Sequence, residues 1–428
     1  MAVPNIWPPL PSAGSCCSEC GAGVTPVSFT YGPMLDAFGR LRVSQPYTLF
    51  DSQQRYSADD AFISNVANGG TVTFNTNQSS TYLTTTTTAN SYAARETKYV
   101  FTYQPGKSLL ALMTFCMAPQ VSGLVQRVGY YGTSNGIFLE LSDQLYMVQR
   151  SNVTGTIVET KVSQNVWSWD TLNGYGTSGY TLDITKTHIF WTDIEWLGVG
   201  NVRTGFVING QFLVAHVFQH ANYATTAYIT TATLPVRYEI LNTDGAQSSN
   251  LIQICSTVIS EGGYDQPYHL YSNIAVLSRT MSAGVWYPVV SLRLAPGFLD
   301  AVAQVKQVDV LMTTTDRLQW ALWSNVSASN LTGANFVAHA SSTLVQIDQS
   351  ATAFTTTGCQ QIAAGLISGT NQTSNASLLE LVKYQAQLGR NSFTQTAEIF
   401  TLAVYSVVGS SGGSSIGLQA LLSWNELL

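Results

Sequence analysis

The sequence predicts an all-β protein, built of antiparallel β-sandwich or jelly-roll-like domains with very little helix. Apolar residues recur with helical spacing in only one short stretch, residues 378–388. Residues 71–88 contain nine threonines, whose branched side chains suit an exposed strand or hairpin and disfavour a helix. Asn-Gly and Asp-Gly dipeptides separate short apolar runs at close intervals, which is typical of a sandwich or barrel.

Individual strands are predicted wherever β-branched and aromatic residues lie between turn signals. The clearest case is a hairpin over 207–213, because Asn209-Gly210 accepts the positive φ angles of a two-residue turn. We expect a first set of strands at 71–88, 99–103, 109–117, 136–141, 145–151, 156–162, 188–196, 203–208, 211–219, 236–241 and 251–260. We expect a second set at 289–294, 308–312, 319–323, 342–347, 398–408 and 417–424.

The residue pattern changes twice along the chain, which predicts three regions. Residues 1–30 are rich in Cys, Pro and Gly and are predicted to form an anchoring arm. Residues 31–275 are predicted to form a large β-sandwich domain, and residues 276–428 a second, smaller one.

Composition narrows the function. Charged residues make up 10% of the chain, against about 25% in an average protein, and the net charge is −6. Uncharged polar residues must therefore cover the surface, as in proteins that pack against copies of themselves or against partners. The 18 basic residues are scattered singly, which excludes a nucleic-acid surface. The longest apolar run, 109–118, covers only about half a membrane span, so no membrane partner is expected.

Cys16, Cys17 and Cys20 form the sharpest local feature of the arm. A Cys-x-x-Cys spacing is a common metal half-site, but no second half-site lies nearby. Three interpretations stay open: a metal site completed by other chains, disulfides between chains, or no special role. No other cofactor is predicted.

Asp193 and Glu195 are the most suggestive pair of carboxylates. They lie two residues apart on a predicted strand and therefore share one face, followed by Trp196. Two carboxyl groups beside an aromatic ring could serve glycoside hydrolysis, whereas the simpler interpretation is a polar sheet face with Asp193 paired to Arg203.

Aromatic residues gather in a glycine-rich stretch just before that strand. They could stack on the faces of sugar rings, although large aromatics more commonly pack in cores or subunit contacts. The candidates for carbohydrate binding are therefore Trp167, Trp169, Tyr175, Tyr180, Asp193 and Glu195.

Standard catalytic motifs are absent from the sequence. It contains no Gly-x-Ser-x-Gly elbow, no His-Glu-x-x-His and no phosphate-binding glycine loop. His216 and His220 are four apart on strand-like sequence, about 13 Å from each other, too far to share a metal. We therefore predict that the protein is not an enzyme.

Residues 36–52 carry the motif DAFGRLRVS followed by TLFDS, which resembles virion structural proteins of tailed bacteriophages, including cyanophages, and also proteins of large algal viruses. Further segments fit the same resemblance: YQPGKS at 103–108, RVGY at 127–130, EWLGVG at 195–200, ISEGG at 259–263 and SWNEL at 423–427. The resemblance implies a structural part of a particle and no known activity.

The virion interpretation gives the chain a location and partners. We expect a structural component assembled in the host cytoplasm, associated with tail, baseplate, neck or fibre, and forming a homo-oligomer, by preference a trimer. The alternatives are a receptor-binding tail protein that binds or depolymerises host-surface glycans, and a capsid decoration or minor capsid protein. Candidates for subunit contacts are Asp36, Phe38, Arg40, Arg42 and Asp51.

Overall fold

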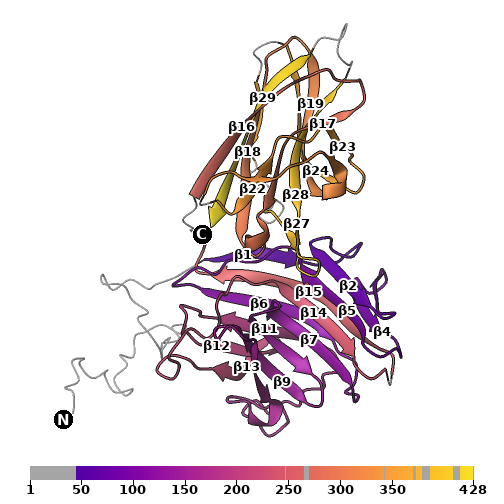
Figure 1. Ribbon diagram of the computed structural model, residues 1–428. Coiled ribbons are helices and arrows are strands. Elements are labelled where there is room, and N and C mark those ends of the chain that lie inside the picture. Colours follow the sequence, from indigo (N-terminus) through magenta and orange to yellow (C-terminus); the bar gives the residue numbers. More distant parts are fainter. Residues whose placement is uncertain are drawn as a thin grey trace, which may run out of the picture. The chain divides into compact units, whose positions relative to one another are not determined.

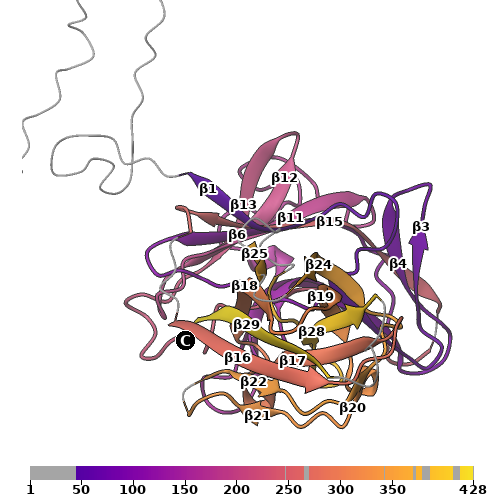
Figure 2. The same cartoon turned by 90° about the horizontal axis from the view of Figure 1, so that it is seen from above.

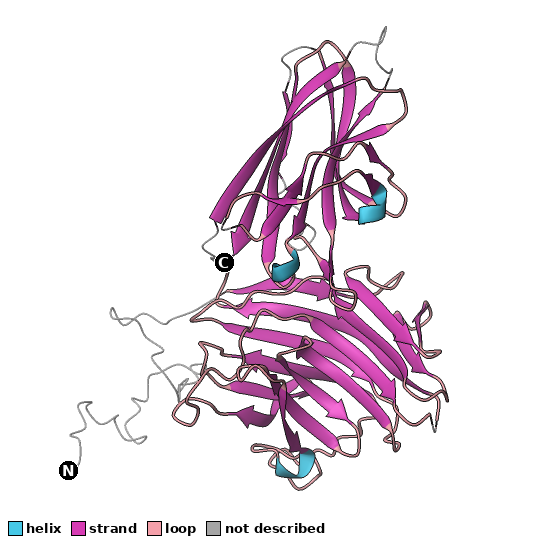
Figure 3. Ribbon diagram, viewed as in Figure 1, coloured by secondary structure: helices cyan, strands magenta, loops and turns pink. Residues whose placement is uncertain are grey.

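The computed structural model describes residues 45–245, 247–264, 269–341, 343–369, 373–377, 386–407 and 415–427. These residues are mostly β-strand (Figure 3), and their strand pairs are antiparallel, so the predicted fold class is confirmed. They contain no α-helix and three short 3-10 turns, Gln164–Val166, Pro296–Phe298 and Ala328–Asn330. The predicted arm and most of 378–388 lie outside the described residues.

The first sandwich consists of two sheets (Figure 1). Sheet A has the order β13-β12-β11-β6-β15-β4-β3, with β1 also paired to β15. Its strands are β1 (Pro46–Ser52), β3 (Thr71–Asn75), β4 (Ser80–Thr85), β6 (Ser108–Cys116), β11 (Thr187–Ile194), β12 (Val202–Ile208), β13 (Gln211–Phe218) and β15 (Ser249–Glu261).

Sheet B has the order β10-β9-β8-β7-β14-β5-β2. Its strands are β2 (Phe62–Ala67), β5 (Ser91–Thr97), β7 (Leu124–Tyr131), β8 (Gly136–Leu141), β9 (Leu145–Ser151), β10 (Val158–Ser163) and β14 (Val236–Asn242).

Side-chain alternation decides which face of each sheet meets the core. Along β6, Leu109, Met113 and Phe115 are buried in the first core, whereas the residues between them point to the other face. The predicted hairpin between β12 and β13 is confirmed, with φ of 51° at Asn209 and 76° at Gly210. One face of sheet A is therefore free to carry a surface site.

The second sandwich also has two sheets. Sheet C has the order β16-β29-β18-β25, and sheet D the order β21-β22-β17-β28-β19-β24. Their strands are β16 (His269–Arg279), β17 (Trp286–Leu294), β18 (Val302–Met312), β19 (Arg317–Val326), β21 (Val337–Ala338), β22 (Val345–Asp348), β24 (Gln360–Ser368), β25 (Thr373–Ser377), β28 (Ile399–Ser406) and β29 (Ile416–Leu427). Two short pairs complete it: β20 (Leu331–Thr332) with β23 (Ala353–Phe354), and β26 (Arg390–Asn391) with β27 (Thr396–Ala397).

The two largest hydrophobic cores lie within one compact unit, Gln45–Leu428. The second core contains Trp320, Phe400 and Trp424, all essentially without solvent exposure. The predicted division into domains at residues 275 and 276 stays a prediction.

A ladder of alternating charges crosses the face of sheet B that points away from the core. Arg237 pairs with Glu96 at 3.0 Å, and Arg127 bridges Glu239 at 2.8 Å and Glu140 at 2.7 Å. The ladder, defined by these ion pairs, continues through Lys161, Glu159 and Arg150. Many of the protein's few charged side chains thus pair with one another within the fold.

Candidate functional site

A pocket of about 500 Å³ opens at one end of sheet A, where β6 and β12 begin and β11 and β13 end. We call it the Trp169 pocket. Antiparallel pairing brings these four strand ends together, with Asp193 opposite Arg203 and also opposite Leu110. Its lining is Tyr103, Gly106, Lys107, Ser108, Trp169, Asp193, Glu195, Leu197, Asn201, Arg203, Val217 and Gln219.

Asp193 supplies a carboxylate at the floor of the pocket, and its side chain is only 7% exposed. Its Oδ2 atom accepts a hydrogen bond from Arg203 Nε at 2.9 Å and pairs with the second nitrogen of the same guanidinium. Its Oδ1 atom is buried, and no hydrogen-bond donor among the described residues contacts it. A buried acceptor without a donor is costly, so a ligand hydroxyl placed there would be bound favourably.

Glu195 lies just past the end of β11, lines the same pocket and is exposed. A tight turn fixes it: its backbone N–H donates to Asn201 O at 3.1 Å, and Gly200 N–H donates to Trp196 O at 2.7 Å. Any side chain at Gly200 would place its Cβ about 2.0 Å from Glu195 O, so the turn requires glycine at this position. Glu195 therefore offers a second carboxylate in a defined place.

Trp169 forms one wall and is 63% exposed, an unusual state for so large an apolar side chain. Its loop is pinned to β13: Trp169 N–H donates to Ala215 O at 3.1 Å, and Ser168 N–H donates to His216 Nδ1 at 3.2 Å. Burial lowers the pKa of His216 to about 4, so its Nδ1 is free to accept at neutral pH. The backbone that carries the indole is thus fixed by β13.

Tyr103 and Trp196 support the pocket from below. Their rings meet edge to face with centroids 5.9 Å apart, and Trp196 Nε1 donates to Ile229 O at 3.3 Å. Burial raises the pKa of Tyr103, so its hydroxyl stays protonated and can donate to a ligand.

Three of the predicted carbohydrate candidates, Trp169, Asp193 and Glu195, meet in this pocket. The suggested pairing of Asp193 with Arg203 is present as well. Trp167 requires a correction: it is 4% exposed and donates from Nε1 to Val162 O at 3.0 Å, so it is a core residue and offers no stacking surface.

The two tyrosine candidates lie apart from the pocket lining. Tyr175 is 96% exposed at the tip of its loop. Tyr180 packs partly against the first core, and its hydroxyl accepts a hydrogen bond from Asn209 Nδ2 at 3.1 Å. Neither reaches the carboxylates, because the loop folds back on Asp170, which accepts from Leu172 N–H at 2.8 Å and Ser178 N–H at 2.6 Å.

Sequence reasoning missed Tyr103, Lys107, Asn201 and Gln219, because loops between different strands deliver them. One signal could have found part of the set. Segments 103–108 and 195–200, quoted above for the resemblance, both line the pocket, and 259–263 lies beside them: Ser108 Oγ donates to Glu261 Oε2 at 3.2 Å.

Other candidates stand outside this pocket. Asp51 is exposed on β1 opposite Thr257, and its role in subunit contact stays a prediction. The remaining candidates lie outside the described residues: Cys16, Cys17, Cys20, Asp36, Phe38, Arg40 and Arg42.

Within the described part of the chain, no group of three His, Cys, Asp or Glu side chains could hold a metal. No helix in that part is long and apolar enough to span a membrane.

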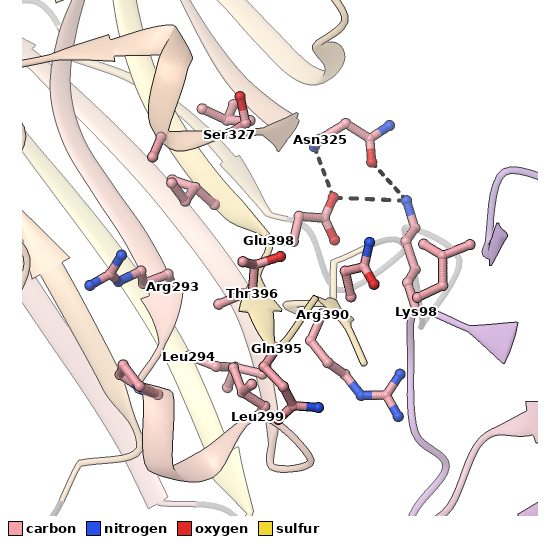
Figure 4. A pocket seen from close by; sticks show the side chains of 17 residues that line it. Lys98, Arg293, Leu294, Leu299, Asn325, Ser327, Arg390, Gln395, Thr396 and Glu398 are labelled. Carbon is pink, nitrogen blue, oxygen red and sulfur yellow. Dashed lines mark hydrogen bonds and ion pairs between the residues drawn. The ribbon is translucent and has the colours of Figure 1, made fainter. Parts of the chain in front are cut away.

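A second pocket of about 500 Å³ lies where Lys98 approaches Glu398 (Figure 4). Its central polar groups satisfy one another: Lys98 Nζ donates to Asn325 Oδ1 at 2.8 Å, and Asn325 N–H donates to Glu398 Oε1 at 2.8 Å. Burial raises the pKa of Glu398, although Lys98, 3.8 Å away, opposes the effect. With these contacts made internally, this pocket is a weaker candidate for recognising a polar ligand.

Comparisons with known proteins give no family. No family model matches the chain, and no curated protein matches its sequence. Among solved structures, the β-glucanase of Bacillus licheniformis is 11% identical with a TM-score of 0.33, covering 51% of this chain and 99% of its own. Peanut lectin is 9% identical with a TM-score of 0.30, covering 51% and 98%.

The CBM2 module of the evolved Dit protein of Lactobacillus casei BL23 phage J-1 is similar at the same level. It is 6% identical with a TM-score of 0.34, and the match covers 52% of this chain and all of that module. Likenesses this distant assign no function to the chain.

Proposed function

We propose that the protein is a virion component of a tailed bacteriophage and that its first sandwich binds host-surface carbohydrate in the Trp169 pocket. The observation that carries the binding proposal is the exposed Trp169 ring in the same pocket as Asp193, whose buried Oδ1 has no donor among the described residues. Sugar rings present an apolar face and a rim of hydroxyls, and a ligand site built of one aromatic wall with a few placed polar groups fits both.

Binding without cleavage fits the carboxylates better than hydrolysis. Glycoside hydrolysis needs one protonated carboxylic acid and one ionised partner flanking the bond. Asp193 Oδ2 is engaged by the Arg203 guanidinium, so this carboxyl group is held as a hydrogen-bond acceptor in an ion pair. The position two residues before Asp193 on β11 lies on the same face of the strand. It is occupied by Trp191, an aromatic residue that is 3% exposed, and not by a second carboxyl group.

Trp169→Ala should weaken binding to a carbohydrate by about 10- to 100-fold, since burying a large apolar side chain contributes about 1.5–3 kcal/mol. A glycan array of bacterial surface oligosaccharides identifies a ligand for the wild type, and calorimetric titration measures the change. Tyr175→Ala is the matched control, because it removes an even more exposed ring outside the pocket.

Equal effects of the two substitutions, or none, would contradict the assignment of the site. Release of new reducing ends from the bound oligosaccharide by the wild type, but not by Glu195→Gln, would replace binding by cleavage.

The virion part of the proposal rests on the resemblance and on the meeting of three of its segments around the pocket. Antibodies raised against the protein are expected to label intact phage particles at the tail under the electron microscope. Absence of the chain from purified particles by mass spectrometry would exclude this location, and labelling of the capsid shell would support the alternative of a decoration protein.

A further inference from the structure

The longest edge strand of the second sandwich is β16, the outermost strand of sheet C (Figure 2). It pairs with β29 over all eleven residues, without a register shift. No strand among the described residues pairs with its other edge, where Gln349 Nε2 approaches Ile274 O at 3.5 Å. Apart from this contact, which the Gln349 side chain would release on pairing, the strand edge is available.

The side chains on the outward face of β16 are apolar or small. Leu270, Ile274 and Val276 are 69%, 62% and 70% exposed, with serines between and after them. Neither lysine, carboxylate nor proline occurs from His269 to Ser278, and the strand has no bulge. Soluble proteins ordinarily protect a long edge with such charges, prolines or bulges, so an edge without them is built for a partner.

The edge of sheet D differs in this respect. There β24 pairs with β19 through a register shift next to Trp323, and it packs beside β25 of sheet C. A neighbouring strand and a bulge both discourage further pairing at that edge. The contrast singles out β16, and not the second sandwich as a whole, as the open edge.

We propose that β16 pairs antiparallel with β16 of a second copy of this chain, related by a two-fold axis at Asn273. Directly opposite residues of an antiparallel pair lie on the same face, so this register sets Leu270 against Val276 and Ser272 against Ile274. No charge opposes a like charge, because Arg279 falls beyond the paired stretch. An edge without charge is complementary to another uncharged edge, and the second copy provides one.

The size of the contact sets its expected strength. In this register nine residues, His269 to Leu277, pair and span about 30 Å, and a contact of that length and two side-chain rows in width buries about 850 Å² in total. This value lies near the lower limit for a specific interface, so we expect a dimer that dissociates on dilution. Self-pairing of one edge yields pairs and not trimers, so a trimer would need a different surface.

Ile274→Lys is expected to raise the dissociation constant of the dimer by more than about tenfold, because both copies lose an apolar side chain from the contact and the two lysines lie diagonally across it on one face, about 7–8 Å apart. Leu366→Lys on β24 is the matched control: it changes a 76% exposed leucine on the other edge and should leave the dimer intact. Sedimentation equilibrium of the full chain over a wide concentration range measures both. A wild-type monomer at the highest concentration, or an equal effect of both variants, overturns the proposal.

A second measurement identifies the segment that pairs with β16. When full-length Ser272→Cys and Ile274→Cys chains are mixed and oxidised, a disulfide is expected between the two substituted positions, because directly opposite residues lie within disulfide range. Mass spectrometry of the linked peptides reads the result. Cross-links from either position to any segment outside β16, including residues 1–44, overturn the self-pairing.

Discussion

Glu96→Ala is expected to lower the free energy of unfolding by about 3–5 kcal/mol, the usual cost of breaking a buried ion pair from one side. Glu96 lies on β5 without solvent exposure. Its two oxygens pair with Arg237 at 3.0 Å and with Arg390 at 2.9 Å, and both guanidinium groups are at least nine-tenths buried. The substitution leaves two buried cations without their shared carboxylate.

Denaturant unfolding at pH 7 measures this effect. The pH is chosen from the pKa of Glu239, a carboxyl group of the ladder. Burial alone would raise the pKa of Glu239, but Arg237 and Arg127 outweigh it and hold that pKa below its ordinary value. A carboxyl with a lowered pKa contributes its full stabilisation above about pH 5 and loses it as the pH falls further. At pH 7 Glu239 therefore contributes its full stabilisation to the ladder.

Lys186→Ala is the matched control for Glu96→Ala. It removes an ion pair with Asp183 at 4.0 Å in which both side chains are more than half exposed, and such exposed pairs contribute little to stability. A Glu96→Ala protein as stable as Lys186→Ala would show that the ladder contributes no more than a surface pair.

The ladder also explains what composition could and could not predict. A charge content of 10% correctly indicated a surface covered by uncharged polar residues, but it could not say where the charges lie. Glu96 and Arg237 are 141 positions apart in the sequence and meet only because β5 pairs with β14. Such pairing is set by the packing of whole sheets, and no local pattern carries it.

Local signals, by contrast, predicted local structure well. Asn209-Gly210 fixed a hairpin, and the suggested pairing of Asp193 with Arg203 on the next strand is present. Their shared place in a glycine-rich stretch did not separate Trp167 from Trp169, which follow the 3-10 turn Gln164–Val166: Trp167 is buried and Trp169 is exposed. A spacing of two residues implies a shared face only inside a strand.

Trp424→Ala is expected to lower the free energy of unfolding by about 3–5 kcal/mol through the cavity that it leaves in the second core. Trp424 has no solvent exposure and lies on β29, between β16 and β18. Its ring packs on Tyr271 and His339, with centroids 6.1 and 5.1 Å away. The segment SWNEL at 423–427, which fits the phage resemblance, therefore lies on β29, an inner strand of sheet C.

The indole also satisfies a buried charge. Trp424 Nε1 donates to Glu426 Oε1 at 2.8 Å, and Leu344 N–H donates to the other oxygen at 2.6 Å. Trp424→Phe keeps most of the volume but removes the first donor, so it should cost about 1–3 kcal/mol and fall between wild type and Trp424→Ala. Denaturant unfolding midpoints order the three proteins.

The exposed Trp169→Ala protein is the control for the loss of a tryptophan as such, and its stability should stay within about 0.5 kcal/mol of the wild type. If Trp424→Ala is no less stable than Trp169→Ala, the second core does not depend on this side chain. If Trp424→Phe is as unstable as Trp424→Ala, the carboxylate of Glu426, rather than the packed volume, dominates the effect. β16 is held in its sheet by pairing with β29. Loss of Trp424 from β29 should therefore also weaken any assembly formed through the free edge of β16.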